Sequence, residues 1–110
     1  MAGLVKGDVV VVPFPFSDLS QAKRRPALVV AELDGDDLIL CQITSRAIRD
    51  RYAIVLDDAD FQSGTLKHVS NVRPNRLFTA DRHIILYRVG HLESKKTEAV
   101  IAKIVEIVQQ

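Results

Sequence analysis

The feature that most constrains the fold is a pair of short apolar runs around a polar turn. The runs are Pro26 to Ala31 and Leu38 to Thr44, and both are typical of buried strands. Between them stands Asp34-Gly35-Asp36-Asp37, where aspartate and glycine adopt a positive φ at little cost. We therefore predict an antiparallel hairpin, in which the start of the first strand lies beside the end of the second.

Further short strands are expected on both sides of this hairpin. Gly7 to Phe14 is β-branched and bounded by glycine and proline, which is typical of a buried strand. Pro26 opens its run, where a missing N–H removes no ladder hydrogen bond. The remaining expectations are a polar turn at Ser17 to Lys23, a strand near Tyr52 to Leu56, a loop at Asp57 to Gly64, a strand at Leu66 to Val72 that Pro74 ends, a short strand or helical turn at Arg76 to Thr79, and a turn or bulge at Gly90 within Ile84 to Leu92.

The C-terminal segment has the periodicity of a helix. From Ser94, a candidate N-cap, the apolar residues recur at helical spacing and predict a stripe that packs on the core: Val100, Ile101, Ile104, Val105 and Val108. Five or six short strands with one terminal helix predict a mainly β fold, a small SH3-like barrel, in a single domain spanning residues 1–110.

Composition limits the cellular setting. Hydrophobic residues make up 47% of the chain and charged residues 26%, which predicts a closed core rather than disorder. The single cysteine, Cys41, lies in an apolar run, so we expect a buried, inert thiol in a reducing cytoplasm. We see no signal peptide, and no apolar stretch approaches the roughly 20 residues that span a bilayer. The sequence therefore predicts a cytoplasmic protein without a membrane partner.

The sequence lacks the motifs that are typical of several classes of site. His68, His83 and His91 share no ligand spacing, and one cysteine cannot anchor zinc, so no metal site is expected. The chain contains neither a phosphate-binding glycine loop nor a G-x-S-x-G elbow. We therefore expect no cofactor, and neither nucleotide-loop nor serine-hydrolase chemistry.

Positive charge is segregated although the net charge is only +1. A nearly neutral chain with segregated charge can present a basic face to a polyanion, and the alternative is a set of solvated loops without a partner. The basic groups are Lys23 to Arg25, Arg46 with Arg49 and Arg51, and Lys67, Arg73, Arg76, Arg82 and Arg88.

The hairpin brings Arg25 and Thr44 to one edge of the sheet. A guanidinium offers a planar fork of donors and a hydroxyl adds one more, so together they suit a phosphate. The alternative is that Arg25 pairs with a carboxylate, such as Asp8 or Asp18.

Four segments in register resemble the MazF/PemK toxin family, over nearly the whole chain from about Gly7 to the final helix. They are Gly7-Asp8-Val9-Val10-Val11-Val12, then Arg25-Pro26-Ala27-Leu28-Val29-Val30, then Ile43-Thr44-Ser45, and a PemK-like run from Val72 to Thr79 followed by Val89-Gly90-His91-Leu92. The resemblance implies a CcdB-like, SH3-related barrel, a homodimer and sequence-specific cleavage of single-stranded RNA without metal. It also implies a cognate antitoxin whose extended tail covers the RNA groove, and contact with DNA only through the antitoxin complex.

The resemblance places the family's catalytic arginine on Arg25 and its catalytic threonine on Thr44. Around them we expect RNA contacts, the alternative being an exposed strand and loop without a ligand. The expected RNA-binding residues are Arg24, Ser45, Lys67, His68, Ser70, Asn71, Arg73 and Arg76. One departure is the short turn from Ser17 to Arg24, where many members have a longer, glycine-rich loop that gates the substrate. The family's recognition sequence therefore does not transfer to this chain.

The expected chemistry is attack by the 2′-hydroxyl on the adjacent phosphate, which leaves a 2′,3′-cyclic phosphate and a 5′-hydroxyl. Arg25 would stabilise the charge on the pentacoordinate phosphorus, and Thr44 would bind a phosphate oxygen or orient the attacking hydroxyl. Two other functions fit the same fold: a CcdB-like toxin that binds DNA gyrase without chemistry, and an inactive barrel that binds RNA or a peptide. The Arg25 and Thr44 pair favours the enzyme, because a gyrase poison does not need it.

Overall fold

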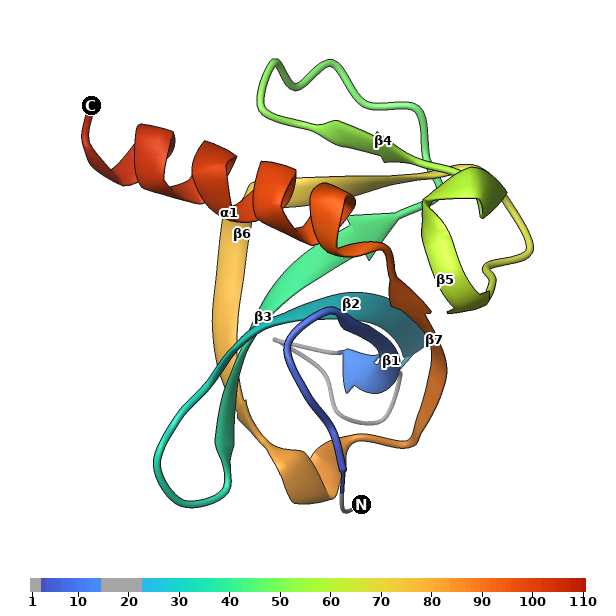
Figure 1. Cartoon of the computed structure of the whole chain (residues 1–110), viewed down its shortest axis with the longest axis vertical. Helices are drawn as coiled ribbons and strands as arrows, with labels where there is room; N and C mark the ends of the chain where they lie inside the picture. Colours follow the sequence, from blue (N-terminus) through green and yellow to red (C-terminus); the bar gives the residue numbers. More distant parts are fainter. Residues whose placement is uncertain (1–2, 15–22) are drawn as a thin grey trace.

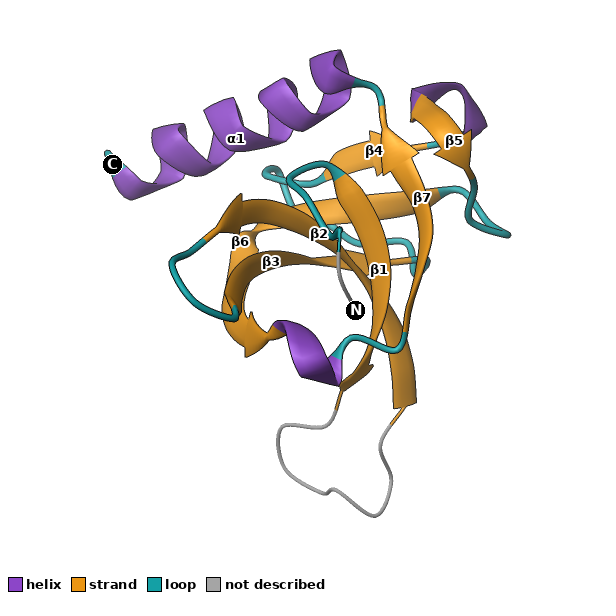
Figure 2. Ribbon diagram, turned by 60° about the horizontal axis from the view of Figure 1, so that its bottom comes forward, coloured by secondary structure: helices purple, strands orange, loops and turns teal. Residues whose placement is uncertain are grey.

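The computed structural model describes residues 3–14 and 23–110 as a curled antiparallel sheet with a C-terminal helix (Figure 1). The elements are β1 (Asp8–Phe14), β2 (Lys23–Glu32), β3 (Asp37–Thr44), β4 (Ile54–Leu56), the 3-10 turn η2 (Asp58–Asp60), β5 (Phe61–Gly64), β6 (Ser70–Asp81), the 3-10 turn η3 (Arg82–Ile84), β7 (Tyr87–Leu92) and α1 (Ser94–Val108). The order across the sheet is β4-β6-β3-β2-β1-β7-β5, which leaves β4 and β5 at its two edges. Figure 2 shows the sheet curled into a half-barrel. The prediction of a mainly β, small-barrel fold with a C-terminal helix is confirmed.

Irregular registers accompany the curl of the sheet. The largest lies between β3 and β6, where Cys41 pairs with Leu77 and Ile43 pairs with Val72, so that residues 73–76 of β6 face one residue of β3. Bulges bend a strand and increase its twist. Pro74 lies inside this bulge, where the ladder requires no N–H from it. The expectation that Pro74 ends a strand is therefore wrong, and β6 continues through it.

The β2 strand begins earlier than expected. It starts at Lys23, and Pro26 is an interior residue that pairs with Val11 of β1. The β3 ladder begins only at Ala27, opposite Gln42. Pro26 is thus tolerated because β2 has a paired neighbour on one side only at this point. The predicted turn at Ser17 to Lys23 lies outside the described residues, except for Lys23 itself.

Two other expectations for the middle of the chain need correction. Asp57 to Gly64 is not a loop, because it contains η2 and the edge strand β5, which pairs with β7. The strand expected at Leu66 to Val72 begins only at Ser70, and Arg76 to Thr79 belongs to the same strand, β6. The strand near Tyr52 to Leu56 is confirmed as β4. The bulge at Gly90 is also confirmed, since the β1–β7 register shifts beside it.

Both faces of the central strands are buried, because alternate side chains enter two different clusters. Val10, Val12, Val29 and Leu40 belong to the first cluster together with Leu4 of the N-terminal segment. This segment runs inside the curl of the sheet (Figure 1), so we call this face concave. On the opposite face, the second cluster contains these buried residues of the strands and of α1: Val9, Leu28, Val30, Cys41, Ile43, Leu56, Val72, Leu92 and Val100. Strands β1 to β3 are therefore fixed from both sides, which holds their ends in place.

The helix follows the predicted stripe for half of its length. Val100 is fully buried and Ile104 packs against the second cluster, but Val105 and Val108 are 45% and 70% exposed. The core-packing expectation is therefore wrong for the last two. Ser94 is the first helical residue rather than the N-cap, which is Glu93 without a side-chain capping bond. Within residues 3–14 and 23–110, no helix is long and apolar enough to cross a membrane.

The thiol of Cys41 is buried, as expected. It donates a hydrogen bond to the backbone oxygen of Arg73 at 3.0 Å. Burial raises the pKa of Cys41 to about 12, and the bond to Arg73 offsets only part of that rise. Because the thiolate is the reactive form, we expect no alkylation of the folded protein at mildly basic pH and complete alkylation in denaturant. Mass spectrometry checks this cleanly, since the chain has one cysteine. Rapid labelling of the folded protein would contradict the burial.

Candidate functional site

The start of β2 and the end of β3 form the candidate site. Ala27 pairs with Gln42, and this register, continued toward the strand ends, sets Arg25 opposite Thr44 and Arg24 opposite Ser45. Successive side chains of a strand point to opposite faces. Arg25 and Thr44 therefore share the concave face, while Arg24 and Ser45 share the other face. At this end of the two strands, each face of the sheet therefore carries one arginine and one hydroxyl side chain.

The Thr44 hydroxyl is held in place. Its side chain is buried, and Oγ1 accepts a hydrogen bond from the backbone N–H of Arg46 at 3.2 Å. A hydroxyl that accepts one bond still has a proton to donate and a second lone pair. The Thr44 hydroxyl is therefore held in position while it can still donate one hydrogen bond and accept another.

Arg25 is half-buried, and no ion pair within residues 3–14 and 23–110 involves it. The alternative that Asp8 neutralises Arg25 is wrong. Asp8 is fully buried and instead accepts hydrogen bonds from the backbone N–H of Val5 and from His91 Nδ1, both at 2.8 Å. The other alternative, Asp18, lies outside the described residues. The charge of Arg25 is thus not balanced by any described carboxylate.

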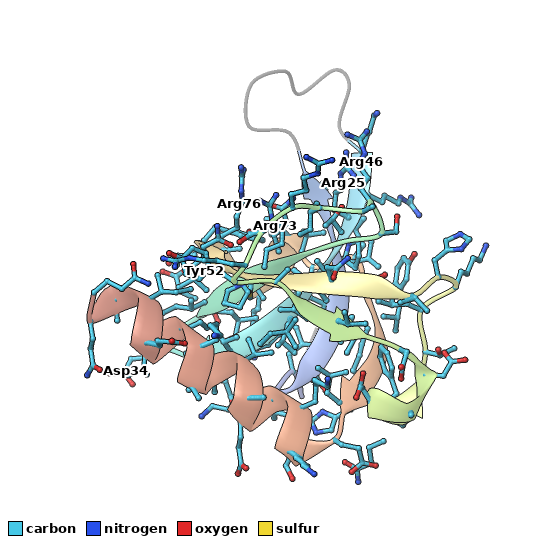
Figure 3. All side chains as sticks on the ribbon, turned by 90° about the horizontal axis from the view of Figure 1, so that it is seen from above. Arg25, Asp34, Arg46, Tyr52, Arg73 and Arg76 are labelled. Atoms are coloured by element: carbon cyan, nitrogen blue, oxygen red, sulfur yellow. The ribbon has the colours of Figure 1, made fainter. Side chains whose placement is uncertain are left out.

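More arginines lie on this side of the molecule. Figure 3 shows Arg25, Arg46, Arg73 and Arg76 together, away from α1. Arg73 alone of these forms an ion pair with a described residue, namely Asp50 at 3.3 Å. Unbalanced positive charge on one side of a protein attracts polyanions and guides their approach.

Asp50 anchors the loop before β4 to the β6 bulge. The backbone N–H of Tyr52 donates to it at 2.9 Å and lowers the pKa of Asp50 most, with Arg73 contributing further. This stabilisation is present above the carboxyl's unfolded pKa and is lost as the pH falls through its depressed folded pKa. We expect Asp50→Asn to lower the free energy of unfolding near neutral pH by about 1 kcal/mol. Urea unfolding at neutral and strongly acidic pH checks this, because the two proteins should converge in acid. An equal gap at both pH values would contradict the role of the charge.

The expected RNA-binding residues divide between the two faces. Five of them line one open hollow of about 460 Å³ on the face of Arg24: Arg24, Ser45, Lys67, His68 and Ser70. Asn71 pairs with Thr44 and therefore lies on the concave face, where its Nδ2 donates to the backbone oxygen of Arg46 at 3.4 Å. Arg73 and Arg76 belong to the β6 bulge.

Sequence reasoning missed part of the hollow. Val11, Tyr87 and Val89 also line it, and no carboxylate does so among the described residues. Tyr87 and Pro26 are both paired with Val11, so the three residues form a row across β7, β1 and β2. The β1–β7 register depends on the bulge beside Gly90, and for that reason the sequence pattern did not reveal the row.

One group of possible metal ligands lies at the other end of the hairpin. Ligand atoms of Asp36, Asp81 and His83 are within 4.8 Å of one another, a proximity that sequence spacing does not show. All three residues are exposed, and the ring Nδ1 of His83 already lies within hydrogen-bond distance of Asp81 Oδ1, at 2.6 Å. We therefore assign no metal to this group.

The strand ends described above lie within a segment, residues 5–108, that matches the family model of the PemK-like, MazF-like toxin of type II toxin–antitoxin systems. The chain belongs to this family. No curated protein matches it significantly. This PemK-like chain is similar to many solved structures, and three of them, all at low sequence identity, are described next.

The first is an endoribonuclease from a mycobacterial species in complex with its cognate antitoxin, with a TM-score of 0.75, 12% identity, and coverage of 97% of this chain and 96% of that one. The second is a MazE–MazF structure from Deinococcus radiodurans, with a TM-score of 0.72, 22% identity and 94% coverage of each chain. The third is the Mycobacterium tuberculosis toxin MazF-mt6, with a TM-score of 0.71, 14% identity, and coverage of 93% and 96%. These likenesses support the fold.

Proposed function

We propose that this toxin is a sequence-specific, metal-independent endoribonuclease that cuts single-stranded RNA through the 2′-hydroxyl of its substrate. The observation that carries the proposal concerns Arg25, a guanidinium without a described counter-ion, and the buried hydroxyl of Thr44. Each lies two residues beyond the Ala27–Gln42 pair, on the same face of β2 and β3. Family membership and the endoribonucleases among similar structures support the cleavage of RNA.

In the proposed reaction, the 2′-oxygen attacks the adjacent phosphorus and the bond from phosphorus to the 5′-oxygen breaks. The attacking hydroxyl loses its proton, and the leaving 5′-oxygen gains one. Arg25 supplies fixed positive charge to the pentacoordinate phosphorus, where such preorganised donors contribute most. A guanidinium retains its proton below about pH 12, so Arg25 is assigned charge stabilisation rather than proton transfer. Thr44 binds a phosphate oxygen or orients the 2′-hydroxyl.

The RNA strand crosses the end of the sheet in this proposal. Its scissile phosphate lies on the concave face with Arg25 and Thr44. Asn71, Arg73 and Arg76 contact the backbone on that side. On the other face, the hollow binds flanking nucleotides through Arg24, Ser45, Lys67, His68 and Ser70. Because the RNA strand passes around the strand ends in this proposal, neighbouring residues such as Arg24 and Arg25 contact it from opposite faces of the sheet.

The proposed partners follow from family membership. One partner is a cognate antitoxin, as supported by similar structures solved with an antitoxin. In this proposal the antitoxin neutralises the toxin by covering the RNA groove. The active form is a cytoplasmic homodimer, and DNA is contacted only through the antitoxin complex.

Mixed-sequence RNA incubated with the pure protein in excess chelator tests the proposal. We expect cuts at one short sequence, each leaving a 5′-hydroxyl and a 2′,3′-cyclic phosphate. Ends that carry a 5′-phosphate would contradict the mechanism. Intact RNA with stalled DNA gyrase would indicate the CcdB-like poison. RNA that is bound but intact would indicate an inactive barrel.

A further inference from the structure

The hollow beside Arg24 has an apolar floor that the proposed cleavage reaction does not explain. The floor is the row Tyr87, Val11 and Pro26, with Val89 beside it. Tyr87 is 43% exposed, so its ring is accessible to a ligand in the hollow. At about 460 Å³, the hollow lies within the roughly 300–1,000 Å³ range of small-molecule sites.

The rim of the hollow has the opposite character to its floor. Arg24 and Lys67 are exposed and form no ion pair with a described residue. Side-chain hydrogen bonds at both ends hold the loop that carries Lys67 and His68. Ser70 Oγ donates to the backbone oxygen of His68 at 2.9 Å, and Thr65 Oγ1 donates to Asp58. A positive rim beside an aromatic and aliphatic floor suits a ligand with a flat apolar part and an attached anion.

We propose that this hollow is a nucleobase subsite, in which Tyr87 stacks on one base of the bound RNA while Arg24 and Lys67 contact the neighbouring phosphates. The inference rests on the proposed function and deepens it, because it names the residues that bind one base of the RNA. An aromatic ring binds any base by stacking. The rim residues His68 and Ser45 supply the polar groups that distinguish one base edge from another.

A second copy of this chain fits the hollow less well. A two-fold contact places the same surface of both copies face to face. The Arg24 and Lys67 side chains of both copies would then be gathered into one interface, with no described carboxylate lining the hollow to balance them, and like charges brought together are costly. Charge complementarity therefore selects a nucleic acid strand as the occupant.

Fluorine NMR of protein labelled with fluorotyrosine tests the inference without cleavage. The chain has two tyrosines, Tyr52 and Tyr87, and therefore gives two resonances. Tyr52 does not line the hollow, and its hydroxyl accepts hydrogen bonds from the side chains of Arg51 and Gln110. The probes are short 2′-O-methyl oligoribonucleotides of each base, which cannot cleave themselves, and an abasic oligomer of the same length. We expect the base-bearing oligomers to shift the Tyr87 resonance and the abasic oligomer to leave it nearly unchanged.

Variants make the assignment quantitative. Tyr87→Ala should weaken binding of the best oligomer by about tenfold, and Tyr87→Phe should retain binding within about twofold, because stacking needs the ring and not the hydroxyl. Leu86→Ala is the matched control, since Leu86 is equally exposed at 42% but does not line the hollow. Its binding should stay unchanged.

Three results would overturn the subsite. One is an equal shift of both tyrosines, the second is an equal response to the abasic oligomer, and the third is a Tyr87 shift that depends on protein concentration alone, which would place a second copy there. RNA cleavage with any of these results would leave the proposed function intact. A selective Tyr87 shift without cleavage would refute the enzyme and support the subsite.

Discussion

Arg25→Ala lowers the rate of RNA cleavage by about 100-fold to 1,000-fold, the usual cost of removing one preorganised donor from a charged transition state. The loss appears in kcat, because the guanidinium acts most strongly on the charge that develops at phosphorus. Initial rates on an RNA containing the mapped cut sequence measure it. Arg25 is half-buried at a strand end and outside both core clusters, so the unfolding midpoint of the Arg25→Ala protein should differ little from that of the wild type.

Two further variants test whether the effect of Arg25 depends on its charge, on its guanidinium geometry and on the face that it occupies. Arg25→Lys keeps the charge but loses the planar fork, so its rate should fall between those of the wild type and Arg25→Ala. Arg24→Ala is the matched control on the opposite face of the same strand. It should raise KM with little change in kcat, because Arg24 holds flanking RNA in both the ground and transition states. Equal kcat losses in Arg24→Ala and Arg25→Ala would contradict the division between the two faces.

Gly64→Ala destabilises the fold by about 3 to 4 kcal/mol, through positive φ and a backbone collision together. Gly64 has a φ of 69° and pairs with Gly90 of β7. A Cβ on Gly64 would lie 2.0 Å from the backbone oxygen of Val89, so β5 would have to move away from β7. Urea unfolding followed by circular dichroism measures the change.

Gly35→Ala separates these two causes. Gly35 has a similar φ of 78°, but a Cβ there would meet no atom within 4 Å. Its substitution should therefore cost only the backbone contribution, about 1 to 2 kcal/mol. Equal losses of unfolding free energy in Gly64→Ala and Gly35→Ala would show that the collision with β7 adds nothing to the cost of a Cβ at Gly64.

The hairpin and the terminal helix were predictable because their signals are local. Two apolar runs joined by an Asp-Gly turn determine a register. Continued two residues past the Ala27–Gln42 pair, that register sets Arg25 opposite Thr44 without any knowledge of the rest of the sheet. The start of α1 was also readable, since Val100 and Ile104 follow helical spacing. Val105 and Val108 share the same spacing yet are exposed, because the core ends before the helix does.

The rest of the sheet depends on pairings between distant segments. In β5, Gln62 and Ser63 are exposed and polar, so its sequence resembles a loop until β7 is known to pair with it. Pro74 indicates a break, but a bulge of β6 accommodates it. Tyr87 enters the hollow only because β7 pairs with β1 in a shifted register. Periodicity within a single segment carries no information about such registers.

The most direct test of the account is a single 2′-deoxy substitution in an RNA substrate, placed at the nucleotide just before the mapped cut. The account predicts that this linkage remains intact, that the substrate still binds, and that 2′-deoxy substitutions at other positions permit cleavage. Cleavage at the modified linkage at an unchanged rate would contradict it, because the nucleophile would then not be the hydroxyl that Arg25 and Thr44 are proposed to serve.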